Sequence, residues 1–360
     1  MESSPDEWFR VNVYPRYDQS RKMLASLIGS KDENSVVIVE NASNAINAIF
    51  RSYQFKSTDK IIYFNTAYGM VKKVLEYIHD TYGVELVEVK LTLDDIQSQE
   101  AIIKKVQEVS LQHKDNAKIA VMCHIVSTPA IKLPVKELVQ FYKSLGIATV
   151  VDGAHAVGNI PLDVSDIGAD YYLSNGHKWL FTPKSGCLLW KNPNATFQIH
   201  PTIISFYYTT NPLDSYQKEF AYIGTRDYSS YLSVKDAIEY RQYLGGEEKI
   251  MTYNTQMAKA IGDMYSKMFG TFTITSDDRL SGGSLVNIKL PFSDSLDFWT
   301  KVQSIVLEKY RSYVVVFEFE GKMYCRISAQ IYNSLEDYQR IGKVFYETAK
   351  TMNGTTATTN

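Results

Sequence analysis

The chain has 360 residues, of which 38 are basic and 40 acidic. This near-neutral balance, without a basic stripe, excludes the electrostatic footprint of a nucleic-acid-binding protein and favours a small-molecule partner. The length allows a large core to be buried without disulfides and predicts one large domain plus a smaller one.

The cysteine content and the start of the chain indicate the cellular compartment. Cys123, Cys187 and Cys325 are odd in number, far apart and each within an apolar run, so we expect neither a disulfide framework nor a metal site. No stretch of about 18 apolar residues occurs, and the opening "MESSPDEWFR" lacks the apolar core of a signal peptide. We therefore predict a cytoplasmic protein that does not bind membranes.

Short β-branched runs alternate with helical periodicity between about residue 20 and residue 195. Strands are expected at 35–40, 60–65, 84–91, 118–125, 147–155 and 169–175, with one more at 185–190. Strands separated by helices predict an α/β fold with a mostly parallel central sheet and helices on both faces.

The pattern changes after about residue 230 to helices at 231–244 and 249–269, followed by short strands. The run at 313–328 reads as two strands joined by a turn at Glu320, Gly321 and Lys322. We therefore expect an N-terminal segment at 1–20, a large domain at 21–235, a smaller C-terminal α+β domain at 236–350 and a disordered polar tail at 351–360.

Asp152 ends the apolar strand in "VVDGAHAVG". A carboxylate buried there needs a cationic partner, and ligands of open α/β sheets bind at the carboxyl ends of strands. The alternative is an Asx turn that only closes the strand.

Lys178 follows the next strand, in "YYLSNGHKWLF". A loop lysine is usually a solvated charge, whereas a nucleophilic lysine needs its neutral amine, which burial and a cation such as a protonated His177 would favour. An acid and an amine at neighbouring strand ends match the requirements of pyridoxal phosphate (PLP): a lysine that bonds to the aldehyde and an acid for the ring nitrogen.

"VVDGAHA" followed by "DYYLSNGHKW" resembles the PLP-dependent enzymes of fold type I, in the class V aminotransferase-like family. This family includes cysteine desulfurases, isopenicillin N epimerase-like proteins and carbon–sulfur lyases. The resemblance implies that Lys178 bonds to the cofactor, that Asp152 pairs with its ring nitrogen and that His155 approaches its ring oxygen.

The cofactor phosphate needs donors, and Asn41, Ala42 and Ser43 stand between a strand and a helix whose first turn offers backbone N–H groups. Asn41 or Ser43 as a plain helix cap is the alternative. The resemblance implies that this segment binds the phosphate, together with Asn175 and His177. A role for Ser174 at the phosphate is left open.

Further cofactor contacts follow from the same resemblance. It implies that the ring of Tyr68 stacks on the pyridine and that His124 and Ser127 lie on its polar side; a core tyrosine and a satisfied strand-end histidine are the alternatives. Gly224 and Thr225 match a pair that reaches the phosphate of a neighbouring subunit, which implies a homodimer with sites at the interface.

The substrate carboxylate calls for a fork-shaped cation. Arg326, in "YCRISAQIYN", resembles the carboxylate-binding arginine of the family; without the resemblance it reads as an ordinary exposed arginine. Members of the isopenicillin N epimerase-like branch carry an "NHGSFG"-like motif ahead of the "WFR" region at Trp8. The substrate contacts of that motif are not carried over to this chain.

The reaction class follows from what the cofactor and Lys178 can do together. The freed amine of Lys178 is a natural base for the substrate Cα proton, after which transamination, epimerisation or loss of a β-substituent can follow. Desulfurases need a cysteine on a mobile loop, whereas the cysteines here lie in strand-like runs.

The motifs look most similar to the isopenicillin N epimerase-like branch, and within it to fungal hercynylcysteine sulfoxide lyases of ergothioneine biosynthesis. The implied reaction converts hercynylcysteine sulfoxide to ergothioneine, pyruvate and ammonia. An aminotransferase, an epimerase and a catalytically silent regulatory dimer are the alternatives.

Overall fold

The computed structural model describes residues 3–209, 212–275 and 277–357. The chain divides into two compact units, which we treat separately. The first comprises Met1–Lys90, Ile103–Ile125 and Pro134–Glu247, and the second comprises Leu91–Ile102, Val126–Leu133 and Glu248–Asn360, each to the extent that it is described. The predicted domain limits stay a prediction, and residues 1–2 and 358–360 of the predicted end segments lie outside the described residues.

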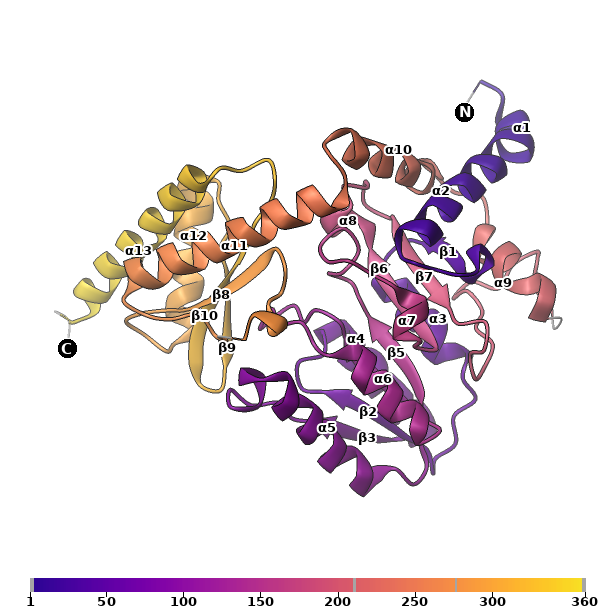
Figure 1. The fold of residues 1–360 in the computed structure, drawn as a ribbon, viewed down its shortest axis with the longest axis horizontal. Helices are drawn as coiled ribbons and strands as arrows, with labels where there is room; N and C mark the ends of the chain where they lie inside the picture. The colour runs from indigo at the N-terminus through magenta and orange to yellow at the C-terminus, as the bar shows by residue number, and fades with distance from the viewer. Residues whose placement is uncertain (1–2, 210–211, 276, 358–360) are drawn as a thin grey trace. The chain divides into compact units, whose positions relative to one another are not determined.

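The first unit contains a seven-stranded sheet with the order β1-β7-β6-β5-β4-β2-β3 (Figure 1). Its strands are β1 (Val36–Val39), β2 (Lys60–Phe64), β3 (Glu85–Val89), β4 (Ala117–Cys123), β5 (Ala148–Asp152), β6 (Tyr171–Asn175) and β7 (Cys187–Lys191). The pairs from β3 to β6 are parallel, and β7 is antiparallel to both of its neighbours. The predicted α/β class with a mostly parallel sheet is confirmed.

Helices connect these strands. They are α1 (Pro5–Glu7), η1 (Trp8–Asn12), α2 (Val13–Leu27), η2 (Glu33–Ser35), α3 (Ala42–Ser52), α4 (Gly69–Tyr82), α5 (Gln99–His113), α6 (Val135–Ser144), α7 (Val164–Ile167), α8 (Gly176–Trp179), α9 (Pro212–Ala221) and α10 (Ser229–Tyr243). Residues of β4, β5 and β6 are buried on both faces of the sheet, which explains their continuous apolar runs. Figure 1 shows α2 and α10 side by side at one end of the sheet, where they pack together.

The register of the central strands brings the ends of β4, β5 and β6 next to one another. Cys123 at the end of β4 pairs with Asp152 at the end of β5, and Asp152 pairs with Leu173 of β6. These strands are parallel, so their carboxyl ends share one edge of the sheet. The chain segments that follow β4, β5 and β6 therefore start from neighbouring points.

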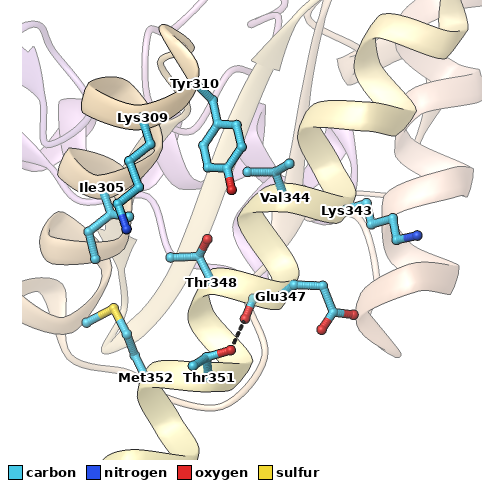
Figure 2. Close-up of a pocket in the computed structure, with 9 residues that line it drawn as sticks. All are labelled: Ile305, Lys309, Tyr310, Lys343, Val344, Glu347, Thr348, Thr351 and Met352. Carbon is cyan, nitrogen blue, oxygen red and sulfur yellow. Dashed lines mark hydrogen bonds between the residues drawn. The ribbon is translucent and has the colours of Figure 1, made fainter.

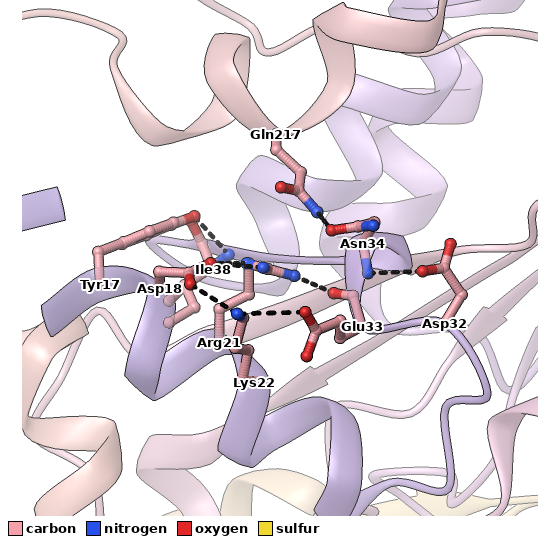
Figure 3. Close-up of polar contacts among 9 residues, drawn as sticks. All are labelled: Tyr17, Asp18, Arg21, Lys22, Asp32, Glu33, Asn34, Ile38 and Gln217. Atoms are coloured by element: carbon pink, nitrogen blue, oxygen red, sulfur yellow. Dashed lines mark hydrogen bonds and ion pairs between the residues drawn. The ribbon is translucent and has the colours of Figure 1, made fainter. Parts of the chain in front are cut away.

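Helix α2 is tied to the outer strand β1 by polar contacts (Figure 3). The guanidinium of Arg21 is buried and donates to the Asp18 carboxylate and to the carbonyl of Glu33. The hydroxyl of Tyr17 accepts the N–H of Ile38 in β1 at 3.0 Å. A buried cation is tolerated here because its donors have acceptors.

The second unit contains a three-stranded antiparallel sheet with the order β8-β10-β9. Its elements are η3 (Asp95–Gln97), α11 (Glu247–Phe269), η4 (Asp278–Leu280), β8 (Leu285–Lys289), α12 (Leu296–Tyr310), β9 (Val315–Phe319), β10 (Lys322–Ser328) and α13 (Leu335–Ala357). The predicted hairpin is confirmed, with positive φ angles of 49° at Glu320 and 70° at Gly321. Helix α11 begins at the last residue of the first unit.

Helices α12 and α13 border a groove of about 460 Å³ (Figure 2). Figure 2 shows Lys309 and Tyr310 on one side and Lys343 and Glu347 on the other, without a cluster of reactive groups among these lining residues. Within the described residues, no helix combines the length and the apolar character needed to cross a bilayer.

Candidate active site

Asp152 is the last residue of β5 and is buried, with 4% of its surface exposed. Its Oδ1 accepts the N–H of Ala154 at 3.0 Å, so the expected Asx turn is present as well. Burial raises the pKa of this carboxyl, while the Ala154 N–H and the nearby Lys178 charge lower it. The position favours a cation that would bring the carboxylate back to its charged form.

Lys178 lies in the one-turn helix α8, directly after β6. Its Nζ is 3.0 Å from Nε2 of His155, which belongs to the turn after β5 and is buried. The chain thus brings together all three predicted catalytic residues, because Asp152 also interacts electrostatically with Lys178. Lys178 is half-buried, and these contacts distinguish it from a fully solvated loop lysine.

The predicted phosphate segment stands at the start of helix α3. Asn41 Oδ1 accepts the N–H of Asn44 at 2.9 Å, so the helix-cap alternative holds for this residue. The side chain of Asn175, at the end of β6, accepts the N–H of Ala42 at 3.0 Å. Two predicted phosphate-binding positions are therefore adjacent, and Ser43 beside them is only half-buried.

Ser174 and His177 flank Asn175. The buried Ser174 hydroxyl donates to the carbonyl of Gly153 and accepts the N–H of Val157 at 2.9 Å. Ser174 thus holds the turn that carries His155. Burial first, and then the charges of Lys184 and Lys178, lower the pKa of His177, which works against the protonated form that would favour a neutral Lys178.

His124 immediately follows β4, and its backbone N–H donates to the carbonyl of Asp152 at 2.8 Å. Its Nδ1 lies 2.7 Å from the hydroxyl of Tyr172, whose pKa burial raises well above the usual value. A Cβ on Gly153 would be 2.4 Å from this hydroxyl. Tyr68 precedes helix α4 with 54% of its surface exposed, so it is not the core tyrosine of the alternative interpretation.

Gly224 and Thr225 lie in the loop between α9 and α10. Gly224 has a φ of 130°, which suits glycine, and Thr225 is exposed. The next residue, Arg226, pairs with Glu40 at 2.5 Å and stacks on the ring of Tyr231. This cation anchors the loop next to the segment that begins at Asn41.

Arg326 and Ser127 are both in the second unit and contact each other. Nη1 of Arg326 donates to the carbonyl and to the hydroxyl of Ser127, at 2.9 Å each. Burial lowers the pKa of Arg326, and its Nε is buried without a hydrogen-bond partner among the described residues. Arg326 is therefore not an ordinary exposed arginine.

A comparison with known protein families shows which family the chain belongs to. The model of the family described as aminotransferase class-V matches residues 8–341. The chain belongs to the aminotransferase class V family.

Individual relatives agree with this assignment. An L-cysteine desulfhydrase from Arabidopsis thaliana is 32% identical over 96% of this chain and 82% of its own length. A hercynylcysteine sulfoxide lyase from Schizosaccharomyces pombe is 28% identical over 95% of this chain and 86% of its own. A lysine-to-alanine variant of C-DES, solved with glycine covalently linked to its PLP cofactor, has a similar fold: the TM-score is 0.74 at 17% identity, covering 94% of this chain and 86% of that one.

Membership of the class V family and the PLP-linked structural neighbour indicate PLP as the cofactor, which confirms the predicted cofactor. The residues fit it on two observations. The Asp152 carboxylate is buried where a cation would stabilise it, and Nδ1 of His177 is buried with no hydrogen-bond partner among the described residues. Both need a polar or charged group, which the ring nitrogen and the phosphate of PLP supply.

Three supporting residues of this class V site were not predicted from the sequence. They are Tyr172, which contacts His124; Trp179, whose Nε1 donates to Nδ1 of His155 at 3.3 Å; and Arg241 of helix α10. Nη1 of Arg241 donates to the carbonyl of Trp179 at 2.7 Å and Nη2 to that of Gly158 at 3.0 Å. The only local signal was the "KW" pair at 178–179, since nothing near Arg241 points to a segment 62 residues away.

Proposed function

We propose that this PLP-dependent carbon–sulfur lyase acts by β-elimination on hercynylcysteine sulfoxide. The carrying observation is the Lys178 amine held 3.0 Å from His155 beside the buried Asp152, a set of groups suited to moving a proton at the substrate Cα. The relative named for this sulfoxide supports the choice of substrate. The products are pyruvate, ammonia and a sulfenic acid that an external thiol reduces to ergothioneine.

Each residue has a defined task in this proposal. When bound, PLP supplies an electron sink for the bond that breaks at Cα. The Asp152 carboxylate would hold the proton on the ring nitrogen, and His155 would donate to the ring oxygen. The Lys178 amine takes the Cα proton, because it is tethered next to the reacting carbon.

The remaining roles concern binding. The phosphate would be held by the segment Asn41, Ala42 and Ser43 at the positive end of helix α3, together with the side chains of Asn175 and His177. In this segment the N–H of Ala42 is donated to Asn175, which fixes the two parts of the proposed phosphate site against each other. The ring of Tyr68 would stack on the pyridine, and His124 and Ser127 would lie at its polar side. Arg326 binds the substrate carboxylate through parallel hydrogen bonds, for which its buried, unpartnered Nε supports the assignment.

L-cysteine is the second candidate substrate. It is favoured by the 32% identical relative that is named an L-cysteine desulfhydrase. β-Elimination of cysteine would release sulfide with the same pyruvate and ammonia, so the residues keep their tasks and only the leaving group differs.

Pyruvate release tests the proposal. The purified chain should release pyruvate from hercynylcysteine sulfoxide with a higher kcat/KM than from L-cysteine or other cysteine S-conjugates. Lys178→Ala should lower this rate by at least about 10³-fold, because the tethered base is lost.

The outcomes separate the alternatives. Preference for L-cysteine selects the second candidate, whereas a keto acid that retains its side chain identifies an aminotransferase, and an inverted Cα an epimerase. Cofactor binding without turnover of any amino acid would identify a silent regulatory dimer and overturn the lyase assignment.

We further propose that the protein is a cytoplasmic homodimer. The three cysteines are free and buried, which suits a reducing compartment. The exposed Thr225, next to a glycine with a positive φ angle, supports a contact with the phosphate of a neighbouring subunit.

A further inference from the structure

His155 has a contact at each ring nitrogen. Trp179 Nε1 donates to Nδ1 at 3.3 Å, and Nε2 lies 3.0 Å from Nζ of Lys178. All three residues belong to the first unit, and His155 and Trp179 are both buried. The backbone of Trp179 is held in place, because Nη1 of Arg241 donates to its carbonyl at 2.7 Å.

These two contacts determine where the protons lie. An indole N–H can only donate, so Nδ1 of His155 must present a lone pair, which excludes the imidazolium. The proton of the neutral ring is then on Nε2, which makes Nε2 a donor. Its partner Lys178 Nζ must accept, and only the neutral amine has a lone pair to accept with.

Nearby titratable groups also influence whether the Lys178 amine is charged. Asp152 favours the ammonium form of Lys178, and its own raised pKa weakens that effect. Burial lowers the pKa of the neighbouring His177, while burial raises the pKa of the Cys123 and Cys187 thiols. The contact that calls for the neutral amine is the one between Nε2 of His155 and Nζ of Lys178.

We propose that Trp179 is a positioning residue: by fixing the tautomer of His155, it holds Lys178 as the neutral amine in the cofactor-free protein. The neutral amine is the form that adds to an aldehyde carbon, so Trp179 prepares the chain to take up PLP. This inference rests on Lys178 being the cofactor lysine, but not on the identity of the substrate.

Aldehyde labelling of the full-length, cofactor-stripped chain tests the proposal. Formaldehyde with cyanoborohydride methylates neutral amines, and mass spectrometry follows the peptide that contains Lys178 across pH, with the exposed Lys184 as internal reference. In Trp179→Phe, His155 can carry its proton on Nδ1 and accept from an ammonium. Labelling of Lys178 near pH 7 should fall about tenfold and its midpoint should rise by about one pH unit.

Trp190→Phe is the matched control. Trp190 is 2% exposed against 3% for Trp179, and its indole N–H donates to the Ser30 hydroxyl at 2.9 Å, away from His155. This variant should label as the wild type does. An unchanged midpoint in Trp179→Phe, or an equal shift in Trp190→Phe, would overturn the proposal.

A measurement on the wild type keeps the test independent of how the variants fold. The ¹⁵N chemical shifts of the His155 ring in the stripped chain should show a bare Nδ1 and a protonated Nε2; a proton on Nδ1 contradicts the proposal. Visible absorbance after PLP is added reports the proposed role of Lys178 separately. If that absorbance fails to develop in the wild type, the role of Lys178 fails; if it develops while the tautomer is wrong, only this inference fails.

Discussion

Asp152 shows how one side chain is prepared for a charged ligand. The carboxyl is buried at a strand end, and desolvation raises its pKa even though Ala154 N–H and Lys178 oppose the shift. A raised pKa means that the folded chain holds this proton more tightly than the unfolded chain does. Stability is therefore lost as the pH rises through the folded-state pKa, and this loss disappears below the unfolded value of about 3.9.

Asp152→Asn should stabilise the cofactor-free chain, because it removes a buried charge and keeps an oxygen for the Ala154 N–H. We expect a gain of roughly 1–3 kcal/mol at pH 7, falling towards zero at low pH, with much weaker binding of PLP. Thermal unfolding of the stripped chain between pH 4 and pH 8 measures the first effect and cofactor titration the second.

Asp170→Asn provides the contrasting control. Asp170 is equally buried, but it accepts from the Thr149 N–H at 2.8 Å, the Thr149 hydroxyl at 3.0 Å and the Thr196 N–H at 3.1 Å. Its replacement should destabilise the chain. If Asp152→Asn lowers the melting temperature as much, the Asp152 charge is already compensated without the cofactor.

At the scale of elements, the candidate site depends on two turns that helix α10 helps to hold from a distance in the sequence. Arg241 of α10 is fully buried and bonds to the carbonyls of Trp179 and Gly158, which follow β6 and β5. Gly158 has a φ of 78°, and a Cβ there would lie 2.7 Å from the backbone of Trp179. Both turns are therefore packed against each other and closed by one guanidinium.

Arg241→Met should lower the stability of the fold by about 3–5 kcal/mol, because it leaves Glu247 and two carbonyls without their partner. It should also weaken PLP binding by the chain that remains folded, since the turns carrying His155 and Lys178 lose their common anchor. Chemical unfolding and cofactor titration at low temperature measure these two effects, and Arg241→Lys should restore part of the binding.

Arg21→Met separates stability from positioning. Arg21 is also buried, but its partners are Asp18 and the Glu33 carbonyl, and neither belongs to the turns that carry His155 and Lys178 (Figure 3). The Arg21→Met substitution should lower the free energy of unfolding and leave the PLP affinity of the folded chain unchanged. Equal losses of affinity in both variants would show that Arg241 acts through stability alone.

At the scale of the whole molecule, the proposed site requires two chains. We place the Lys178 group in one subunit and Thr225 of the neighbouring subunit at the same phosphate. The anchor of the loop is internal, since Arg226 pairs with Glu40 of its own chain. Exposed apolar side chains at Ile203, Ile204 and Phe206 precede this loop.

Mixed dimers test this arrangement. We expect Lys178→Ala chains to bind no PLP covalently and Thr225→Val chains to bind it weakly. Refolding the two together should create hybrid dimers in which one site combines a native Lys178 with a native Thr225. Tight covalent binding of PLP, measured by visible absorbance, should reappear at one site per hybrid; no recovery would place Thr225 in its own subunit's site or nowhere near it.

The sequence by itself determined the fold class and the family, and it supplied the residues that we propose for the chemistry. These follow from local signals: apolar runs mark strands buried on both faces, and reactive residues stand directly after them, as Asp152 and Lys178 do. Such signals need no knowledge of distant segments.

Tertiary structure decided how these residues are held. Three features depend on burial or on partners far along the chain: the lowered pKa of His177, the use of Ser174 to brace the turn of His155, and the contacts of Trp179 and Arg241. Hydrogen bonds and desolvation act over a few ångströms of space, and periodicity carries no information about which distant segments come that close.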